Sequence, residues 1–110
     1  MSQETRRFMR MLVFFDLPTV TRGDKRAYTL FRRFLLQDGY DMIQWSVYGR
    51  IVNGADDEEK HLKRLVANMP QKGSVRYLKI SEKQFAGIQI LLGTLTVQEE
   101  KVGMQQLLLF

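Results

Sequence analysis

Cysteine is absent from this chain of 110 residues. The absence excludes disulfides, thiolate metal sites and cysteine nucleophiles together, and it agrees with a reducing cytosol. Long apolar runs are absent too: no segment approaches the roughly 20 apolar residues that a membrane-spanning helix needs, and the first seven residues lack the apolar stretch of a signal peptide. We therefore expect a cytoplasmic protein with no membrane association.

Histidine occurs once, as His61. A serine nucleophile is activated by a histidine that a carboxylate orients, and the sequence suggests no such arrangement for Ser46. His61 falls on a predicted helix beside an acidic stretch, where we expect it to lie at the surface. Hydrolysis by a serine triad is therefore not expected.

Negative charge is in the minority, with 12 Asp and Glu against 17 Lys and Arg and a net charge of +5. Such a balance suits a polyanionic partner without identifying one. A chain of this length has room for one hydrophobic core. We therefore expect one folded unit with one system of binding residues.

The first half of the chain alternates between strand and helix patterns. Residues 10–16 form a short apolar run that is typical of a strand buried on both faces. Thr21 followed by Asp24 has the pattern of a helix start, and residues 40–52 are typical of two strands joined by a tight turn near Trp45. The expected buried face of the first helix consists of Ala27, Leu30, Phe31, Phe34 and Leu35.

The second half continues with the same kinds of pattern. Four acidic residues at 56–59 predict the start of a second helix, because the helix dipole favours negative charge there, and residues 74–80 alternate as a further strand. Ser81 opens a second capping pattern, and residues 105–110 are typical of an apolar terminal strand. The expected buried face of the second helix consists of Leu62, Leu65, Val66 and Met69.

This order of elements predicts an α+β fold, a ferredoxin-like βαββαβ sandwich in residues 1–92 with helices on one face of the sheet. Residues 93–110 are expected to form a C-terminal extension with an extra strand. Because the first strand is apolar on both sides, we expect the second sheet face to bury against another copy, which gives a homodimer. The extension is expected to dock on the dimer mate or on another partner.

One face of the first helix is basic, because several Lys and Arg fall within one narrow stripe. Such side chains displace counterions from phosphates and position a duplex without reading its bases. The alternative is that the charges only keep the helix face solvated, which is their usual role. The candidates for phosphate binding are Arg22, Lys25, Arg26, Arg32 and Arg33, with Arg76 added from a later strand.

Short motifs are spread over most of residues 8–92. They are Phe14-Phe15-Asp16-Leu17-Pro18, Lys25-Arg26-Ala27-Tyr28, Phe31-Arg32-Arg33-Phe34-Leu35, Gln44-Trp45-Ser46-Val47-Tyr48 and Ser81-Glu82-Lys83-Gln84-Phe85. In their order and spacing these motifs resemble CRISPR-associated protein two, the smaller of two proteins with which CRISPR systems acquire spacers. The last motif looks like members from type II systems, which use a single effector nuclease.

The resemblance implies a homodimer that bridges two dimers of the larger integrase, CRISPR-associated protein one, and holds a double-stranded prespacer DNA across the assembly. The integrase performs the transesterification, and the smaller protein contacts phosphates with basic residues near its first helix. Arg22, Lys25 and Arg26 match those family positions, whereas the other three candidates rest on the charge pattern alone.

Asp16 stands at the carboxyl end of the first strand, and the resemblance makes it the ligand of a catalytic divalent metal. Carboxylates suit a hard cation such as Mg²⁺, and a dimer axis would let two copies of Asp16 share one, although one carboxylate per chain is a small ligand set. The alternative role is structural, with Asp16 capping the next turn through hydrogen bonds to amides near Pro18 and Thr19.

Three functions are open from the sequence. The leading interpretation is a structural DNA-binding subunit of the spacer-acquisition complex. The second is a stand-alone Mg²⁺-dependent endonuclease that acts on RNA or DNA through Asp16, and the third is a sequence-tolerant nucleic-acid binder with no integrase partner. Stacking of bases on Trp45, Phe14 or Phe15 is a further possibility, although aromatics in apolar runs more often belong to the core.

Overall fold

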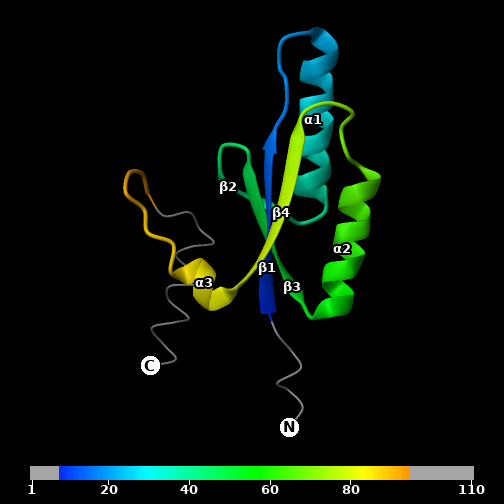
Figure 1. Ribbon diagram of the computed structural model, residues 1–110. Helices are drawn as coiled ribbons and strands as arrows, with labels where there is room; N and C mark the ends of the chain where they lie inside the picture. The colour runs from blue at the N-terminus through cyan, green and yellow to red at the C-terminus, as the bar shows by residue number, and fades with distance from the viewer. Residues whose placement is uncertain (1–7, 95–110) are drawn as a thin grey trace.

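The computed structural model describes residues 8–94 of the chain. The four strands in this range form one antiparallel sheet in the order β2-β3-β1-β4. Figure 1 shows α1 and α2 against one face of that sheet. The predicted ferredoxin-like βαββαβ arrangement is confirmed. The elements are β1 (Phe8–Asp16), α1 (Arg22–Gln37), β2 (Asp41–Gln44), β3 (Val47–Asn53), α2 (Ala55–Ala67), β4 (Ser74–Ser81) and α3 (Glu82–Ala86).

Both predicted capping patterns are formed. The Thr21 hydroxyl accepts a hydrogen bond from the Asp24 amide at 3.0 Å, and the Asp24 carboxylate accepts one from the Thr21 amide at 3.1 Å. Ser81 and Gln84 make the same reciprocal pair at the start of α3. These bonds satisfy amides that have no partner inside a helix, so both helices begin where the sequence indicated.

A two-residue turn joins β2 and β3, as predicted. Gln44 pairs with Val47, which leaves Trp45 and Ser46 at the turn. Ser46 has a φ of 65°, a left-handed conformation that residues other than glycine adopt mainly in turns. Its carbonyl accepts a hydrogen bond from the Phe15 amide at 3.1 Å. That bond fixes the turn beside the carboxyl end of β1.

The main core lies between the sheet and the two long helices. Met11, Val13 and Phe15 point toward it at alternate positions of β1, where they pack with Phe31 and Leu35 of α1. The ring centroids of Phe15 and Phe31 are 5.2 Å apart in an edge-to-face arrangement. Because β1 is a central strand, this core positions its carboxyl end and the start of α1 together.

Parts of the predicted helix faces do not reach this core. Leu30 of α1 is exposed and Phe34 is only half-buried, because the connection after α2 leaves a cavity over that side of the helix. Val66 of α2 is exposed as well, and Met69, also exposed, lies beyond the end of α2 at Ala67. The 3.6-residue repeat identified the apolar side of each helix, but not how much of that side the neighbouring segments cover.

His61 is buried, with 4% of its surface exposed, so the predicted surface position was wrong. Its Nδ1 lies 2.8 Å from a carboxylate oxygen of Asp38 and 3.3 Å from an Arg50 nitrogen, and its Nε2 lies 3.4 Å from Asp57. A buried imidazole is tolerated when it has polar partners of this kind. Two of the three partners come from other elements, which the sequence pattern does not reveal.

The second face of the sheet is partly covered by the chain itself. Phe85 of α3 packs on Leu12 of β1, and both are buried. Arg10, also buried, lies over the Phe85 ring at 4.4 Å and bonds Glu82 at 2.6 Å. The expectation that this face is left open for a second copy is therefore wrong for the centre of the face, which α3 covers. Apolar side chains remain exposed around that centre, namely Phe8, Ile51 and Leu78.

The predicted C-terminal strand lies outside the described residues, as does most of the predicted extension 93–110. Residues 88–94 form neither helix nor strand. The homodimer and the division at residue 92 stay predictions. Among residues 8–94, no helix is long and apolar enough to cross a bilayer.

Candidate nucleic-acid interface

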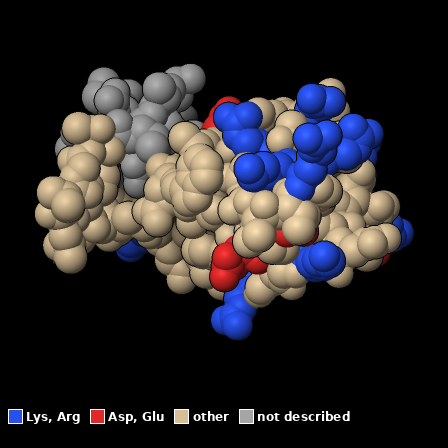
Figure 2. Space-filling view, turned by 90° about the horizontal axis from the view of Figure 1, so that it is seen from above, with Lys and Arg blue, Asp and Glu red and all other residues tan. Residues whose placement is uncertain are grey.

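The predicted basic stripe exists on α1. At about 100° per residue, its Lys and Arg fall within an arc of about 120° on the side of the helix away from the core. Figure 2 shows Lys and Arg side chains gathered on one side of the end of the molecule where α1 begins. The five residues of this basic stripe are all exposed: Arg22, Lys25, Arg26, Arg32 and Arg33.

The basic stripe differs from the other long helix in its ion pairs. On α2, Lys60 lies 3.3 Å from Asp57 and Lys63 lies 3.8 Å from Glu59. Arg64 of the same helix bonds a carboxylate at 2.9 Å. No residue of the basic stripe forms an ion pair with a carboxylate in the described part of the chain. The stripe therefore offers positive charge that residues 8–94 do not neutralise.

One residue of the basic stripe is also tied to the sheet. The Arg32 Nε donates a hydrogen bond to the Tyr48 hydroxyl at 2.7 Å, and Tyr48 is buried in β3. This bond satisfies a buried hydroxyl and holds one side of the guanidinium. Arg32 therefore has a structural role in addition to any contact with a ligand.

Trp45 lies next to the basic stripe. Its indole stacks on the Tyr28 ring, with centroids 5.7 Å apart and planes 22° apart, yet 72% of Trp45 is exposed. Tyr28 belongs to α1 and is one helical turn from Lys25 and Arg32. Of the three aromatics weighed from the sequence, Phe15 is in the core and Phe14 is half-buried, whereas Trp45 is at the surface.

Arg76 lies apart from the basic stripe. It pairs with Phe14 across β1 and β4, so both belong to the sheet face opposite the helices. Arg76 is exposed on that face. The structure therefore brings five of the six predicted phosphate-binding residues together and places the sixth on another surface.

Asp16 is exposed at the end of β1. By strand alternation its side chain belongs to the same sheet face as Arg76. No group of three or more His, Asp and Glu within residues 8–94 is arranged to hold a metal, so a single copy does not provide the ligand set that Mg²⁺ prefers. The alternative capping role also lacks support, because the described residues donate no hydrogen bond to the Asp16 carboxylate.

Shifted pKa values in the described residues come from structural hydrogen bonds and from burial. The Asn53 amide lowers the pKa of Asp57, and the Tyr77 hydroxyl lowers that of Glu58. Burial raises the pKa of Tyr77, and it raises that of Tyr40 to about 12. Each shift strengthens the charge state that the group already has at neutral pH. None of these groups is therefore prepared to act as a general acid or base.

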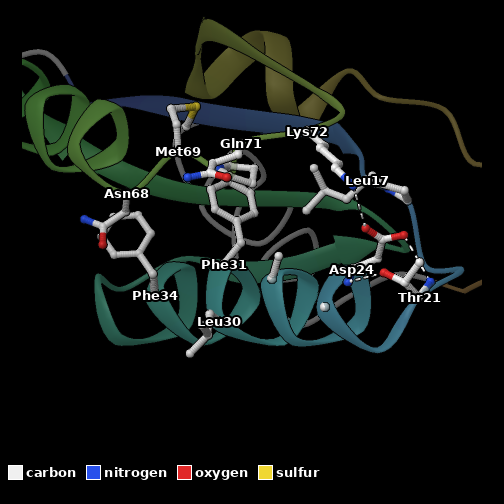
Figure 3. A pocket seen from close by; sticks show the side chains of 14 residues that line it. Leu17, Thr21, Asp24, Leu30, Phe31, Phe34, Asn68, Met69, Gln71 and Lys72 are labelled. Carbon is white, nitrogen blue, oxygen red and sulfur yellow. Dashed lines mark hydrogen bonds and ion pairs between the residues drawn. The ribbon is translucent and has the colours of Figure 1, made fainter.

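A cavity of about 490 Å³ lies on another side of α1. Figure 3 shows Phe31 and Phe34 pointing from the helix toward the connection that carries Asn68 and Gln71. An ion pair of 3.6 Å between Lys72 and Asp24 closes one end. The lining is part apolar and part polar and lies on a side of α1 away from the basic stripe, so the cavity is separate from the candidate interface.

Comparisons with known proteins agree with the fold. The family model of CRISPR associated protein Cas2 matches residues 9–88, from β1 to just beyond α3. A relative from Acidovorax ebreus is 63% identical over 102 residues, which are 93% of this chain and 100% of the relative. Relatives from Flavobacterium psychrophilum and Parvibaculum lavamentivorans are 38% and 42% identical, covering 94% and 77% of this chain and 90% and 84% of their own lengths.

All three relatives are named CRISPR-associated endoribonuclease Cas2. The family model covers well over half of the chain, and the match with the Acidovorax relative extends over that protein's whole length. This chain therefore belongs to the CRISPR-associated protein Cas2 family.

Proposed function

We propose that this chain is a structural DNA-binding subunit of the CRISPR spacer-acquisition complex. In this role a homodimer bridges two dimers of the integrase, CRISPR-associated protein one, and holds a double-stranded prespacer DNA by its phosphates. The observation that carries the proposal is the contrast between the two long helices. The cations of α2 pair with carboxylates, whereas the basic stripe of α1 has none among residues 8–94.

The chemistry of the basic stripe fits a backbone contact. Arg and Lys side chains on a helix surface bind phosphates and release condensed counterions, and such contacts carry no sequence information. The stripe presents no Asn or Gln between its cations that could read a base edge. We therefore expect binding to duplex DNA of any sequence, with an affinity that falls steeply as salt rises.

Assembly tests the proposal directly. The chain is co-expressed with the integrase from the same locus, and the purified mixture is run on size-exclusion chromatography with light scattering, with and without a prespacer-length duplex. One complex that contains both proteins and the duplex supports the structural role. A monomeric chain that elutes apart from the integrase and the duplex contradicts it.

A second candidate is an endoribonuclease, which the name of the relatives favours. A divalent metal would supply an activated water for attack on a phosphodiester. The family resemblance assigns this metal to Asp16, and since residues 8–94 hold no group of three or more His, Asp and Glu arranged for a metal, the site would require Asp16 from two copies. Labelled RNA is incubated with the chain and Mg²⁺ or Mn²⁺, beside the Asp16→Asn variant. Cleavage by the parent chain but not by the Asp16→Asn variant supports a nuclease, and equal cleavage by both points to a contaminant.

A further inference from the structure

We propose that Trp45, supported by Tyr28, is a stacking site for an unpaired nucleobase at the edge of the basic stripe. The inference rests on the proposed nucleic-acid binding and names which part of the polymer this position receives. Indole and phenol rings stack on bases of any identity because every base has an aromatic face.

The exposure of Trp45 is unusual for an indole. Burial of a large aromatic side chain is strongly favourable, yet 72% of this residue remains in solvent. One face of the indole lies against Tyr28 at a centroid distance of 5.7 Å. The opposite face is therefore open, and a flat partner can add to the stack as a third ring.

The position of the indole is fixed on both sides. Its turn is held by the bond from the Phe15 amide to the Ser46 carbonyl. Tyr28 is held in turn by the Phe15 ring, whose centroid is 6.0 Å from that of Tyr28. A platform that is already ordered loses little conformational entropy when a ligand stacks on it.

The surrounding charge identifies the class of ligand. Lys25 and Arg32 lie three and four positions from Tyr28, so cations flank the platform along the helix. An aromatic face beside a row of cations suits a base joined to its phosphates, whereas an apolar peptide would leave the cations without an anionic partner. Inside a duplex both faces of a base are covered by its neighbours. The platform therefore fits an unpaired base or one at a frayed end.

The chain contains one tryptophan, so fluorescence excited at a wavelength that its four tyrosines do not absorb reports on this residue alone. The test titrates the full chain with three probes of equal length: oligothymidylate, oligouridylate and an abasic oligodeoxynucleotide. We expect the two base-containing probes to quench Trp45 and the abasic probe to bind without quenching. The two base-containing probes distinguish DNA from RNA as the source of the base.

Two substitutions give a matched comparison by anisotropy. Trp45→Phe keeps an aromatic face, whereas Trp45→Leu keeps an apolar side chain of similar exposure without one. We expect Trp45→Leu to bind oligothymidylate about 5- to 150-fold more weakly and to bind the abasic probe unchanged, with Trp45→Phe close to the parent chain. Circular dichroism checks that both variants fold, which their position in an exposed turn favours.

The failures of the two proposals are distinguishable. If every probe binds equally with no quenching, and Trp45→Leu has no effect, the stacking site is refuted while the phosphate contacts stand. If no probe binds at low salt while a blunt duplex does, the stacking site is refuted and the phosphate contacts to duplex DNA stand. If neither the probes nor the duplex binds, both proposals are refuted.

Discussion

Replacing Arg26 or Arg33 with glutamine removes one cation of the basic stripe without removing its length or polarity. If each contacts one phosphate, the slope of log affinity against log salt becomes less steep by about 0.9 per chain, or about 1.8 in a homodimer that presents both copies to one duplex. When salt rises from about 50 to 200 mM, the affinity of the parent homodimer for the duplex then falls by a factor about 12 times larger than that of the variant homodimer.

The same change of charge on α2 is the matched control. Lys63 is also exposed, but it lies 3.8 Å from Glu59, so we expect Lys63→Gln to leave the slope unchanged. Fluorescence anisotropy of a labelled blunt duplex over a series of salt concentrations measures both variants. Arg26→Lys, which keeps the charge, should retain most of the parent slope.

One result would refute this reasoning. If Lys63→Gln flattens the slope as much as Arg26→Gln does, the duplex responds to the net charge of +5 and not to the basic stripe. An unchanged slope in both Arg26→Gln and Arg33→Gln would contradict binding along the basic stripe and direct the search to another surface, where Arg76 is the predicted residue that lies off the stripe.

Three further outcomes follow from the described contacts. Tyr77→Phe removes the hydroxyl bond that lowers the pKa of Glu58. Urea unfolding should show a free energy of unfolding about 1–2 kcal/mol lower at neutral pH, and this loss should fade as the pH falls from 4.5, the ordinary pKa of Glu, through the lowered pKa of the folded protein. An equal loss at pH 2 would contradict this. Gly73→Ala should lower stability by about 2–4 kcal/mol, measured by the same unfolding, because φ is +97° and a Cβ would lie 2.5 Å from the Asp16 carbonyl oxygen; a neutral effect would refute the strain. Asp16→Asn should leave duplex affinity within about twofold in the anisotropy assay, since the exposed side chain belongs to the sheet face opposite the basic stripe.

Local patterns predicted most of the fold. The capping pairs at Thr21 and Ser81 mark helix starts by bonds between residues three positions apart, so the sequence contains both partners. The basic stripe followed from helical spacing for the same reason. Arg76 could not be placed by spacing, because its sheet face depends on the register between β4 and β1.

The burial of His61 and the exposure of Trp45 could not be read from the sequence. Asp38, the nearest partner of His61, is 23 residues away at the C-terminal end of α1 and meets α2 only in the folded chain. Trp45 stays at the surface because its turn is held beside Phe15, which itself takes the core position. Both outcomes depend on contacts between elements, and periodicity within one element carries no information about them.

The placement of Phe15 has a consequence for how the surface of this protein can vary. One residue supplies the amide that holds the turn of Trp45 and the ring that packs against both Tyr28 and Phe31. A substitution at Phe15 would move the platform and the basic stripe together, even though the residue itself meets no ligand. Among relatives, we therefore expect the residues at positions 15, 28 and 45 to change together, and the exposed Lys and Arg of the basic stripe to vary independently of them.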